Sequence, residues 1–302
     1  MEPRILSSGE PGRWSPGPAA VLWAVLGLIG CSFPAVAQTP LEIRFRAEVQ
    51  GQPLACGKIY PGVGRARSAV TLKDFRFYVS GFRLVGADGS ETPLALVPDG
   101  KWQSETTALL DFEDGSGPCR NGTPDMNDVV RAVAPAGKPF RGLRFSVGVP
   151  EAGNHADLTE SAPPLDLVAL FWSWNAGHKF IRLDIATKGL PQGAAIHIGS
   201  TGCALQSPGS SQPRPPCKSP NRPEIRLDPF DPASDLVVVD LASLLAASDL
   251  EHNAPGSPVL CMSDPEDLDC APIFHNLGLP FGQRPAGVQT FLRAERAAHK
   301  GP

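Results

Sequence analysis

Short runs of alternating apolar and polar residues constrain the fold of this chain most. The alternation is clearest at 41–49 and 141–149, and it places Ile181, Leu183 and Ile185 on one face of a third run. The 302 residues include 33 prolines and 31 glycines, which separate such runs. This spacing predicts an all-β protein, an antiparallel β-sandwich or barrel with long disulfide-stapled loops and one or two short helices.

Other segments are predicted with less regular patterns. Short strands are expected at 70–79, 81–85, 194–199 and 236–240. Short helices are expected at 127–133 and 241–248, the second with Asp240 as its N-cap. The segment 165–172 fits either a helix or a buried strand. The difference matters locally because Trp172 and Trp174 share a face only in a strand.

The N-terminus, 1–37, is predicted to be a signal peptide. Arg4 and Arg13 precede an apolar run at 19–29, and small residues end the segment at Ala37. The run is shorter than the roughly 20 residues of a membrane-spanning helix. Cleavage after Ala37 is favoured, but lipidation of Cys31 fits a lipoprotein signal and stays open. We therefore expect a periplasmic or exported protein, with or without a lipid anchor.

The rest of the chain is expected to form a single β domain at 38–296, followed by a flexible tail at 297–302. The composition of 284–302 favours a loose tail over that longer stretch as well.

Six cysteines remain after Cys31, and an exported chain favours disulfides among them. Fifteen pairings are possible in principle. Local spacing favours Cys203–Cys217 and Cys261–Cys270, which leaves Cys56 for Cys119. A thiolate metal site is the alternative, but the chain contains no C-x-x-C pair.

Composition and motifs exclude several functions. Charged residues are 19% of the chain and the formal net charge is −4, so there is no broad basic surface for nucleic acid. The sequence has no nucleophile elbow, zinc-protease motif or phosphate loop. The acidic stretch 264–269 matches no EF-hand spacing and fits a solvated loop better. An exported hydrolase is a weak alternative, because no acid/base constellation stands out.

Two of the five tryptophans, Trp172 and Trp174, stand one residue apart, close to His178. His155 precedes them and His197 follows, each flanked by small residues. A single histidine is more often structural than a metal ligand. The concentration of indole and imidazole groups nevertheless makes a metal site a reasonable hypothesis.

Several motifs in one order resemble a known family. They are Gln52-Pro-Leu-Ala-Cys-Gly57, Leu72-Lys-Asp-Phe-Arg-Phe-Tyr-Val-Ser80, Asn154-His-Ala-Asp157, Phe171-Trp-Ser-Trp174, Gly177-His-Lys-Phe180, His197-Ile-Gly-Ser-Thr-Gly-Cys203, Cys217 with Pro220-Asn-Arg222, and Cys261-Met262 with Cys270. Together they resemble the MbnP-type copper-binding proteins, also called the metallo-mystery pair four-Cys motif family. The chain departs from the pattern at His178, where tyrosine is expected.

The resemblance implies a periplasmic, non-enzymatic copper protein with a role in copper homeostasis. Its expected partner is an MbnH-like dihaem c-type cytochrome of the peroxidase and MauG group. That partner would oxidise the first tryptophan of the motif, here Trp172, to kynurenine, and copper binding would depend on the change.

The implied ligands suit Cu(I), because ring opening of an indole yields an aryl amine that can join two imidazoles. The expected ligands are His155, His197 and Trp172 as kynurenine, with His178 in reserve. Trp174 is a possible electron relay to the partner, and Asp157 is expected to orient His155. The alternative function is a disulfide-stabilised binding module for a protein or carbohydrate, with Trp102, Trp172 and Trp174 as a stacking surface.

Overall fold

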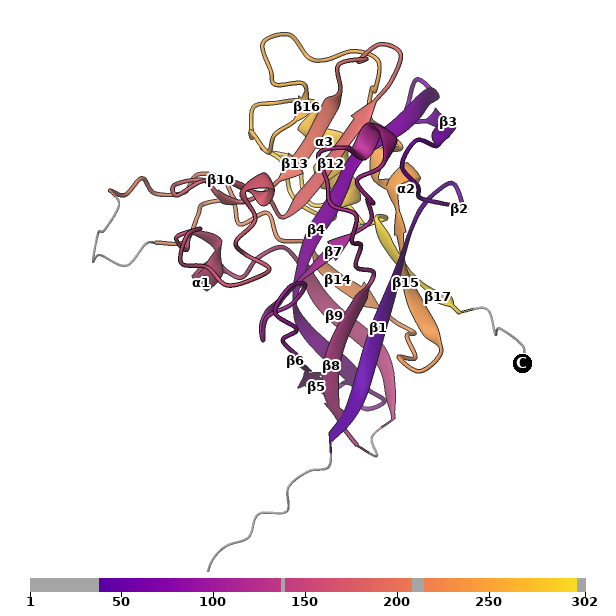
Figure 1. Ribbon diagram of the computed structural model, residues 1–302, viewed down its shortest axis with the longest axis vertical. Coiled ribbons are helices and arrows are strands. Elements are labelled where there is room, and N and C mark those ends of the chain that lie inside the picture. The colour runs from indigo at the N-terminus through magenta and orange to yellow at the C-terminus, as the bar shows by residue number, and fades with distance from the viewer. Residues whose placement is uncertain (1–37, 137–138, 208–214, 298–302) are drawn as a thin grey trace, which may run out of the picture. The chain divides into compact units, whose positions relative to one another are not determined.

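The computed structural model describes residues 38–136, 139–207 and 215–297. The predicted signal peptide with Cys31, and all of the predicted tail except Ala297, lie outside the described residues. One sheet has the strand order β17-β15-β1-β8-β6, with β2 paired to β1 (Figure 1). Its strands are β1 (Gln38–Val49), β2 (Gln52–Pro53), β6 (Ala95–Leu96), β8 (Val129–Pro135), β15 (Asp235–Asp240) and β17 (Leu292–Arg296).

The second sheet has the order β14-β9-β4-β12-β13-β16, and β3, β5 and β7 also pair with β4. The 19-residue strand β4 (Ser68–Gly86) runs through this sheet and pairs with β12 in its first half and β9 in its second. The other strands are β3 (Ile59–Val63), β5 (Glu91–Pro93), β7 (Thr107–Asp111), β9 (Phe140–Val147), β12 (Ile181–Ala186), β13 (Ala194–Ile198), β14 (Glu224–Leu227) and β16 (Leu260–Cys261).

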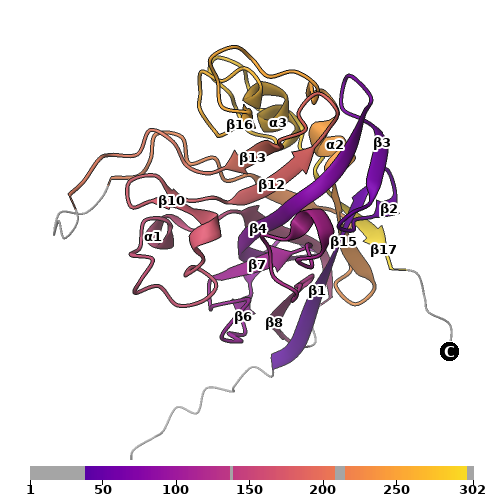
Figure 2. The ribbon, with the colours of Figure 1, turned by 45° about the horizontal axis from the view of Figure 1, so that its top comes forward.

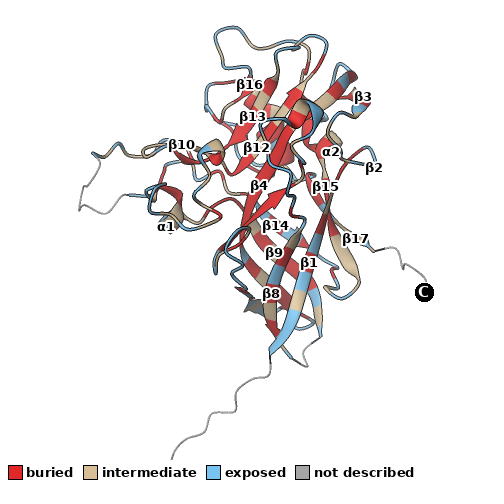
Figure 3. Cartoon of the chain, in the orientation of Figure 1, coloured by how far each residue is buried: buried red, intermediate tan, exposed pale blue. Residues whose placement is uncertain are grey.

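The two sheets pack their apolar faces against each other. Phe45 of β1 meets Phe145 of β9 edge to face, with ring centroids 5.8 Å apart. Phe75 and Phe77 of β4 are fully buried in the same core, and buried residues mark the length of β4 in Figure 3. Their alternation along the strand places every second side chain in the core. The predicted all-β class is confirmed, and the packing is that of a sandwich.

The described residues also contain short helices at the edges of the sheets. Helix α2 (Leu241–Leu245) begins at Asp240, whose side chain accepts a hydrogen bond from Ser243 N–H, as its predicted N-cap role requires. Helix α3 (Cys270–Asn276) was not expected from the sequence. It lies beside α2, as Figure 2 shows. The remaining helical segments are α1 (Glu151–Asn154), η1 (Gly117–Cys119) and η2 (Val168–Leu170).

Two sequence predictions are wrong. The expected helix at 127–133 is largely strand β8, because Val129, Val130 and Val133 are β-branched and the strand pairs with β1 over seven residues. The expected loose tail at 284–302 contains strand β17, which pairs antiparallel with β15. Phe291 and Leu292 are buried in the core and hold that strand in place. At both positions, pairing with a strand that is distant in the sequence decided the structure, against the prediction from local sequence and composition.

A second, smaller apolar cluster fixes the loop that carries the tryptophan motif. Tyr78, Leu109, Val149, Leu170 and Phe180 are its fully buried members. The Tyr78 hydroxyl donates a 2.8 Å hydrogen bond to the Pro164 carbonyl oxygen. Because Tyr78 belongs to β4, this bond ties the loop to the centre of the second sheet.

The three disulfides are Cys56–Cys119, Cys203–Cys217 and Cys261–Cys270, the pairing that spacing favoured. They are consistent with an exported protein. Among the described residues, no helix is both long and apolar enough to cross a membrane.

Candidate metal centre

Trp172 lies in a short hairpin formed by β10 (Phe171–Ser173) and β11 (Gly177–His178). Its six-membered ring rests on the backbone just after β13. A Cβ atom added to Gly199 would lie 2.5 Å from Trp172 Cζ3 and 2.6 Å from the His178 carbonyl oxygen. Only a residue without a side chain allows the indole to approach so closely. The segment 165–172 is thus neither of the two forms considered, since η2 is followed directly by β10.

His197 lies on the outer face of the second sheet, two residues before Gly199. Its neighbours Ile196 and Ile198 point into the core, so alternation along β13 turns His197 the other way. The His197 Nε2 atom lies 2.7 Å from Asp184 Oδ1 on the adjacent strand β12. A carboxylate can only accept, so this bond fixes the tautomer with the proton on Nε2.

The other ring nitrogen of His197 receives no partner from the part of the chain that the structure describes. His197 Nδ1 is buried and makes no hydrogen bond with any of these residues. Buried polar atoms are rarely left unsatisfied, and an exception calls for an explanation such as an ion. A histidine that donates one N–H to a carboxylate and offers the other nitrogen's lone pair has the arrangement of metal-bound histidines. The donor chemistry therefore fits a metal ion.

Two adjoining surface pockets share one residue, Met262. One, of about 320 Å³, is lined by Asp184, His197 and Met262 among others. The second, of about 550 Å³, is lined by Trp172, Cys203 and Met262. Met262, whose thioether is a soft ligand, thus lines both the pocket of the imidazole and the pocket of the indole. Sequence reasoning missed Met262 and Asp184 as site residues.

Asp184 is held by a chain of buried charges. Arg182 donates to Asp184 Oδ2 at 2.8 Å and lies 3.2 Å from Asp74 Oδ2. Burial alone would raise the pKa of Asp184, but the hydrogen bond from His197, together with the charge and the hydrogen bond of Arg182, outweighs it and lowers that pKa. Asp184 is therefore a carboxylate at neutral pH, able to accept from His197.

The charge chain continues across β4 to β7. Arg76 donates to Asp74 at 2.9 Å and faces Glu113, and Arg76 pairs in register with Asp111. Burial raises the pKa of Asp111 to about 7, despite the lowering effects of a backbone hydrogen bond and Arg76. Three acids thus surround a single buried arginine.

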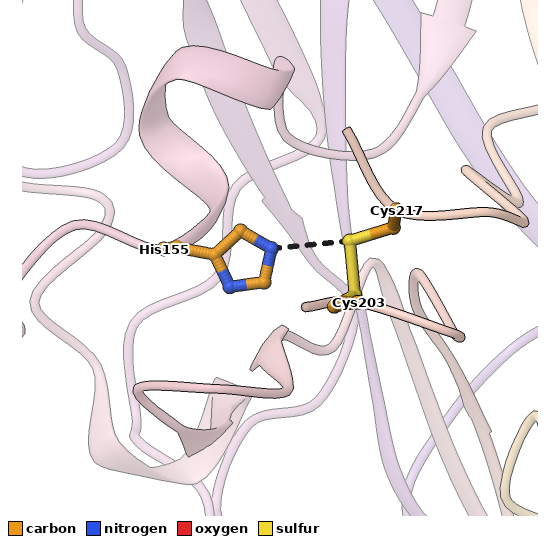
Figure 4. A group of neighbouring side chains, drawn as sticks. All are labelled: His155, Cys203 and Cys217. Carbon is orange, nitrogen blue, oxygen red and sulfur yellow. Dashed lines mark hydrogen bonds between the residues drawn. A yellow bond between two sulfur atoms is a disulfide. The ribbon is translucent and has the colours of Figure 1, made fainter. Parts of the chain in front are cut away.

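His155 occupies a different environment, beside the Cys203–Cys217 disulfide (Figure 4). Its Nδ1 lies 3.1 Å from the Trp174 carbonyl oxygen, and its Nε2 lies 3.1 Å from Asn154 Nδ2 and 3.3 Å from Cys217 Sγ. A carbonyl requires a donor and an amide N–H an acceptor, so the proton belongs on Nδ1. The lone pair of Nε2 then lies beside the sulfur.

Asp157 does not orient His155 in this structure, contrary to expectation. Its Oδ1 accepts from Thr159 N–H at 2.9 Å and from the Thr159 hydroxyl at 2.7 Å. The orienting acceptor is the Trp174 carbonyl instead. A turn that begins with aspartate bonds its own backbone two residues later, which directs the carboxylate away from the preceding histidine.

His178, the reserve ligand, is fully buried and uses both ring nitrogens. Nδ1 lies 2.9 Å from the Asn154 carbonyl oxygen and Nε2 lies 3.1 Å from the Leu165 carbonyl oxygen. Its backbone N–H donates to Asn154 Oδ1. His178 thereby fastens the tryptophan hairpin to α1, and the structure gives it a structural role.

Three of the predicted ligands therefore fall into two neighbouring groups. His197 and Trp172 line pockets that share Met262, whereas His155 reaches the pocket of Trp172 through the disulfide that includes Cys203. Among described histidines, cysteines and acids, the only groups of three with ligand atoms within 4.8 Å are His155 with Cys203 and Cys217, and Glu113 with Cys56 and Cys119.

Fold and site define an all-β, disulfide-bonded protein with an unpaired imidazole nitrogen beside an indole. A family model described as MbnP matches residues 38–263. A solved structure of MbnP from Methylosinus trichosporium shares 31% sequence identity, covers 87% of this chain and 100% of its own, and gives a TM-score of 0.77. No curated protein matches. The chain belongs to the MbnP family.

Proposed function

We propose that this chain is a copper-binding protein whose site is completed when Trp172 is oxidised to kynurenine. The observation that carries the proposal is the buried, unpaired Nδ1 atom of His197, held in position through Asp184. The role of this chain is to bind metal rather than to catalyse a reaction, and the chain acts in copper homeostasis in the periplasm.

The proposed donors are His197 Nδ1, the aryl amine of the modified residue 172, the Met262 thioether and His155. Imidazole, amine and thioether ligands together favour Cu(I) over hard cations. His155 would join only after its ring turns away from Asn154 and Cys217. Copper would be coordinated by these residues and would take part in no reaction. The geometry of the donor atoms would therefore determine the affinity of the site for copper.

The oxidation is needed because an indole nitrogen is a poor ligand, since its lone pair belongs to the aromatic system. Oxidative cleavage of the indole C2–C3 bond adds two oxygen atoms and gives an N-formyl ketone. Hydrolysis of the formyl group then releases formate, so that the residue has lost one carbon, gained one oxygen and carries an aryl amine and a ketone. The open pocket that Trp172 lines gives an outside oxidant access to this ring. We propose that the oxidant is an MbnH-like dihaem cytochrome. Trp174 as its electron relay stays a prediction.

Substitution of Trp172 tests the proposal. The Trp172→Phe variant, produced together with the dihaem partner, is expected to lose stoichiometric copper, because phenylalanine cannot yield an amine. Trp102→Phe is the matched control, since Trp102 lies outside the motif in the sequence and is not among the residues that line the two pockets. Metal analysis of both purified proteins gives the answer, and equal copper in the two would overturn the ligand role of residue 172.

The alternative function, a binding module with a tryptophan surface, receives no support from the contacts of these rings. Trp102 packs against the Tyr78 cluster and lies under the Lys101 ammonium group, and Trp172 lies on Gly199. Two of the three rings, those of Trp102 and Trp172, therefore make packing contacts within the chain.

A further inference from the structure

The Cys203–Cys217 disulfide differs from the other two in its surroundings. Cys203 is partly exposed and lines the pocket of Trp172, and Cys217 contacts an imidazole. Both sulfurs of Cys261–Cys270 are completely buried. Cys119 is likewise completely buried, and the ligating side chain near its disulfide is Glu113, whose oxygens accept from Gly115 and Thr123 N–H groups.

We propose that Cys203–Cys217 is a reducible disulfide, and that its opening creates a soft-metal site formed by Cys203, Cys217 and His155. The ligand atoms of these three residues already lie within 4.8 Å of one another (Figure 4). Two thiolates and an imidazole are ligands for Cu(I), Zn(II) and Cd(II). This site shares His155 with the proposed copper site but does not include His197.

The reaction requires a dithiol as reductant. Its first thiolate attacks Cys203 Sγ, because Cys203 is the more exposed of the two cysteines, and the S–S bond breaks with the electron pair going to Cys217 Sγ. The second thiol of the reagent then attacks the mixed disulfide and releases the Cys203 thiolate. The reagent is oxidised to its disulfide and the protein gains two electrons. Cys217, the leaving group, is the sulfur beside His155.

The spacing between His155 Nε2 and Cys217 Sγ suits a metal ion. A zinc ion binds sulfur at about 2.3 Å and nitrogen at about 2.0 Å, so at a tetrahedral angle these two atoms lie about 3.5 Å apart. The observed separation of His155 Nε2 and Cys217 Sγ is 3.3 Å. The bond from His155 Nδ1 to the Trp174 carbonyl already fixes the tautomer that presents Nε2.

The position of the site links it to the proposed copper pocket. Cys203 and Trp172 line the same pocket, so opening the disulfide places a thiolate in its wall. A reductant would thereby add strong sulfur ligands next to bound copper.

Thiol labelling followed by Cd(II) binding tests the inference. The purified chain is treated with increasing dithiothreitol, freed of it without oxygen, and divided between alkylation and titration with Cd(II). We expect Cys203 and Cys217 to be alkylated at dithiothreitol concentrations that leave Cys261 and Cys270 unlabelled. We also expect one Cd(II) per chain with a thiolate-to-cadmium ultraviolet band.

Three variants identify the ligand. His155→Ala and His155→Gln should label as the parent does but bind Cd(II) at least about tenfold more weakly. Glutamine retains a donor for the Trp174 carbonyl, which guards against a loss due to misfolding. His197→Ala should bind Cd(II) as the parent does even if it loses copper, so failure here is separate from failure of the proposed function.

Three results would overturn the inference. One is alkylation of all six cysteines at the same dithiothreitol concentration. Another is Cd(II) binding that is equal in the parent and both His155 variants. The third is Cd(II) uptake without the thiolate band.

Discussion

At the scale of single residues, the account depends on which nitrogen of His197 is free. Asp184 accepts a hydrogen bond from His197 Nε2–H, and the buried Nδ1 atom keeps a lone pair that meets no partner among the described residues. A carboxylate that accepts a hydrogen bond from a metal-binding histidine orients the imidazole ring and raises its basicity. The carboxylate of Asp184 is therefore as much part of the site as the imidazole.

Replacing that carboxylate should weaken copper binding while the ligands remain. We expect Asp184→Asn to lower copper affinity by roughly 10- to 100-fold, because an amide can no longer attract the His197 N–H with a full charge. Competition with a chromogenic Cu(I) chelator measures it. Asp157→Asn is the control, since the Asp157 carboxylate accepts from Thr159 and not from His155. Similar losses in the two variants would contradict the role of Asp184.

The sequence indicated His197 but not its partners. Small neighbours and the family motif pointed to the histidine. Asp184 was missed because its contact with His197 depends on the register between β12 and β13, which alternation within one strand does not determine. Met262 stands in one of the family motifs, but it was missed as a site residue because only the folded chain shows that it lines both pockets.

At the scale of elements, the tryptophan hairpin depends on a close approach to the end of β13. Glycine at 199 allows the Trp172 ring to touch the backbone. We expect Gly199→Ala to displace the hairpin and to cost about 1–3 kcal/mol in the free energy of unfolding, as overpacking does. Copper loading should fall as well, because residue 172 moves.

Chemical denaturation of Gly199→Ala and a control glycine variant measures the effect. Gly153→Ala serves as control, because its added Cβ would meet only the flexible end of Leu165 at 3.2 Å and Val149 at 3.4 Å. A loss in Gly199→Ala no greater than that in Gly153→Ala would show that the close approach is not a constraint.

Strands with strong alternation were predicted well, and elements defined by pairing were not. The run at 41–49 became β1, and Ile181, Leu183 and Ile185 share the buried face as expected. Strand β17 escaped prediction because it is short and takes its stability from β15 and the core. Helix α3 escaped because its first residue, Cys270, is held by a disulfide rather than by a side-chain cap.

At the scale of the whole molecule, the buried charges across β4, β7 and β12 should make stability depend on pH. The pKa of Asp111 rises from 3.8 to about 7 on folding, so the folded state binds this proton more tightly than the unfolded chain. The stabilisation is present in full below pH 3.8 and is lost as pH rises through 7. Ionised Asp111 therefore destabilises the folded state at neutral pH.

The Asp111→Asn variant removes the carboxyl group that titrates. Between pH 5 and pH 8 the parent should lose about 2–3 kcal/mol of unfolding free energy relative to the variant. Urea denaturation of both proteins across this range measures the difference. Parallel pH profiles would contradict the burial effect assigned to Asp111.

The central claim is that copper binding requires a chemical change at Trp172. Peptide mass spectrometry and copper analysis of the same preparations, made with and without the dihaem partner, test it most directly. The account predicts that the peptide containing residue 172 loses one carbon and gains one oxygen only with the partner, and that stoichiometric copper appears only in that preparation. Equal copper in a preparation whose Trp172 is unmodified would contradict it.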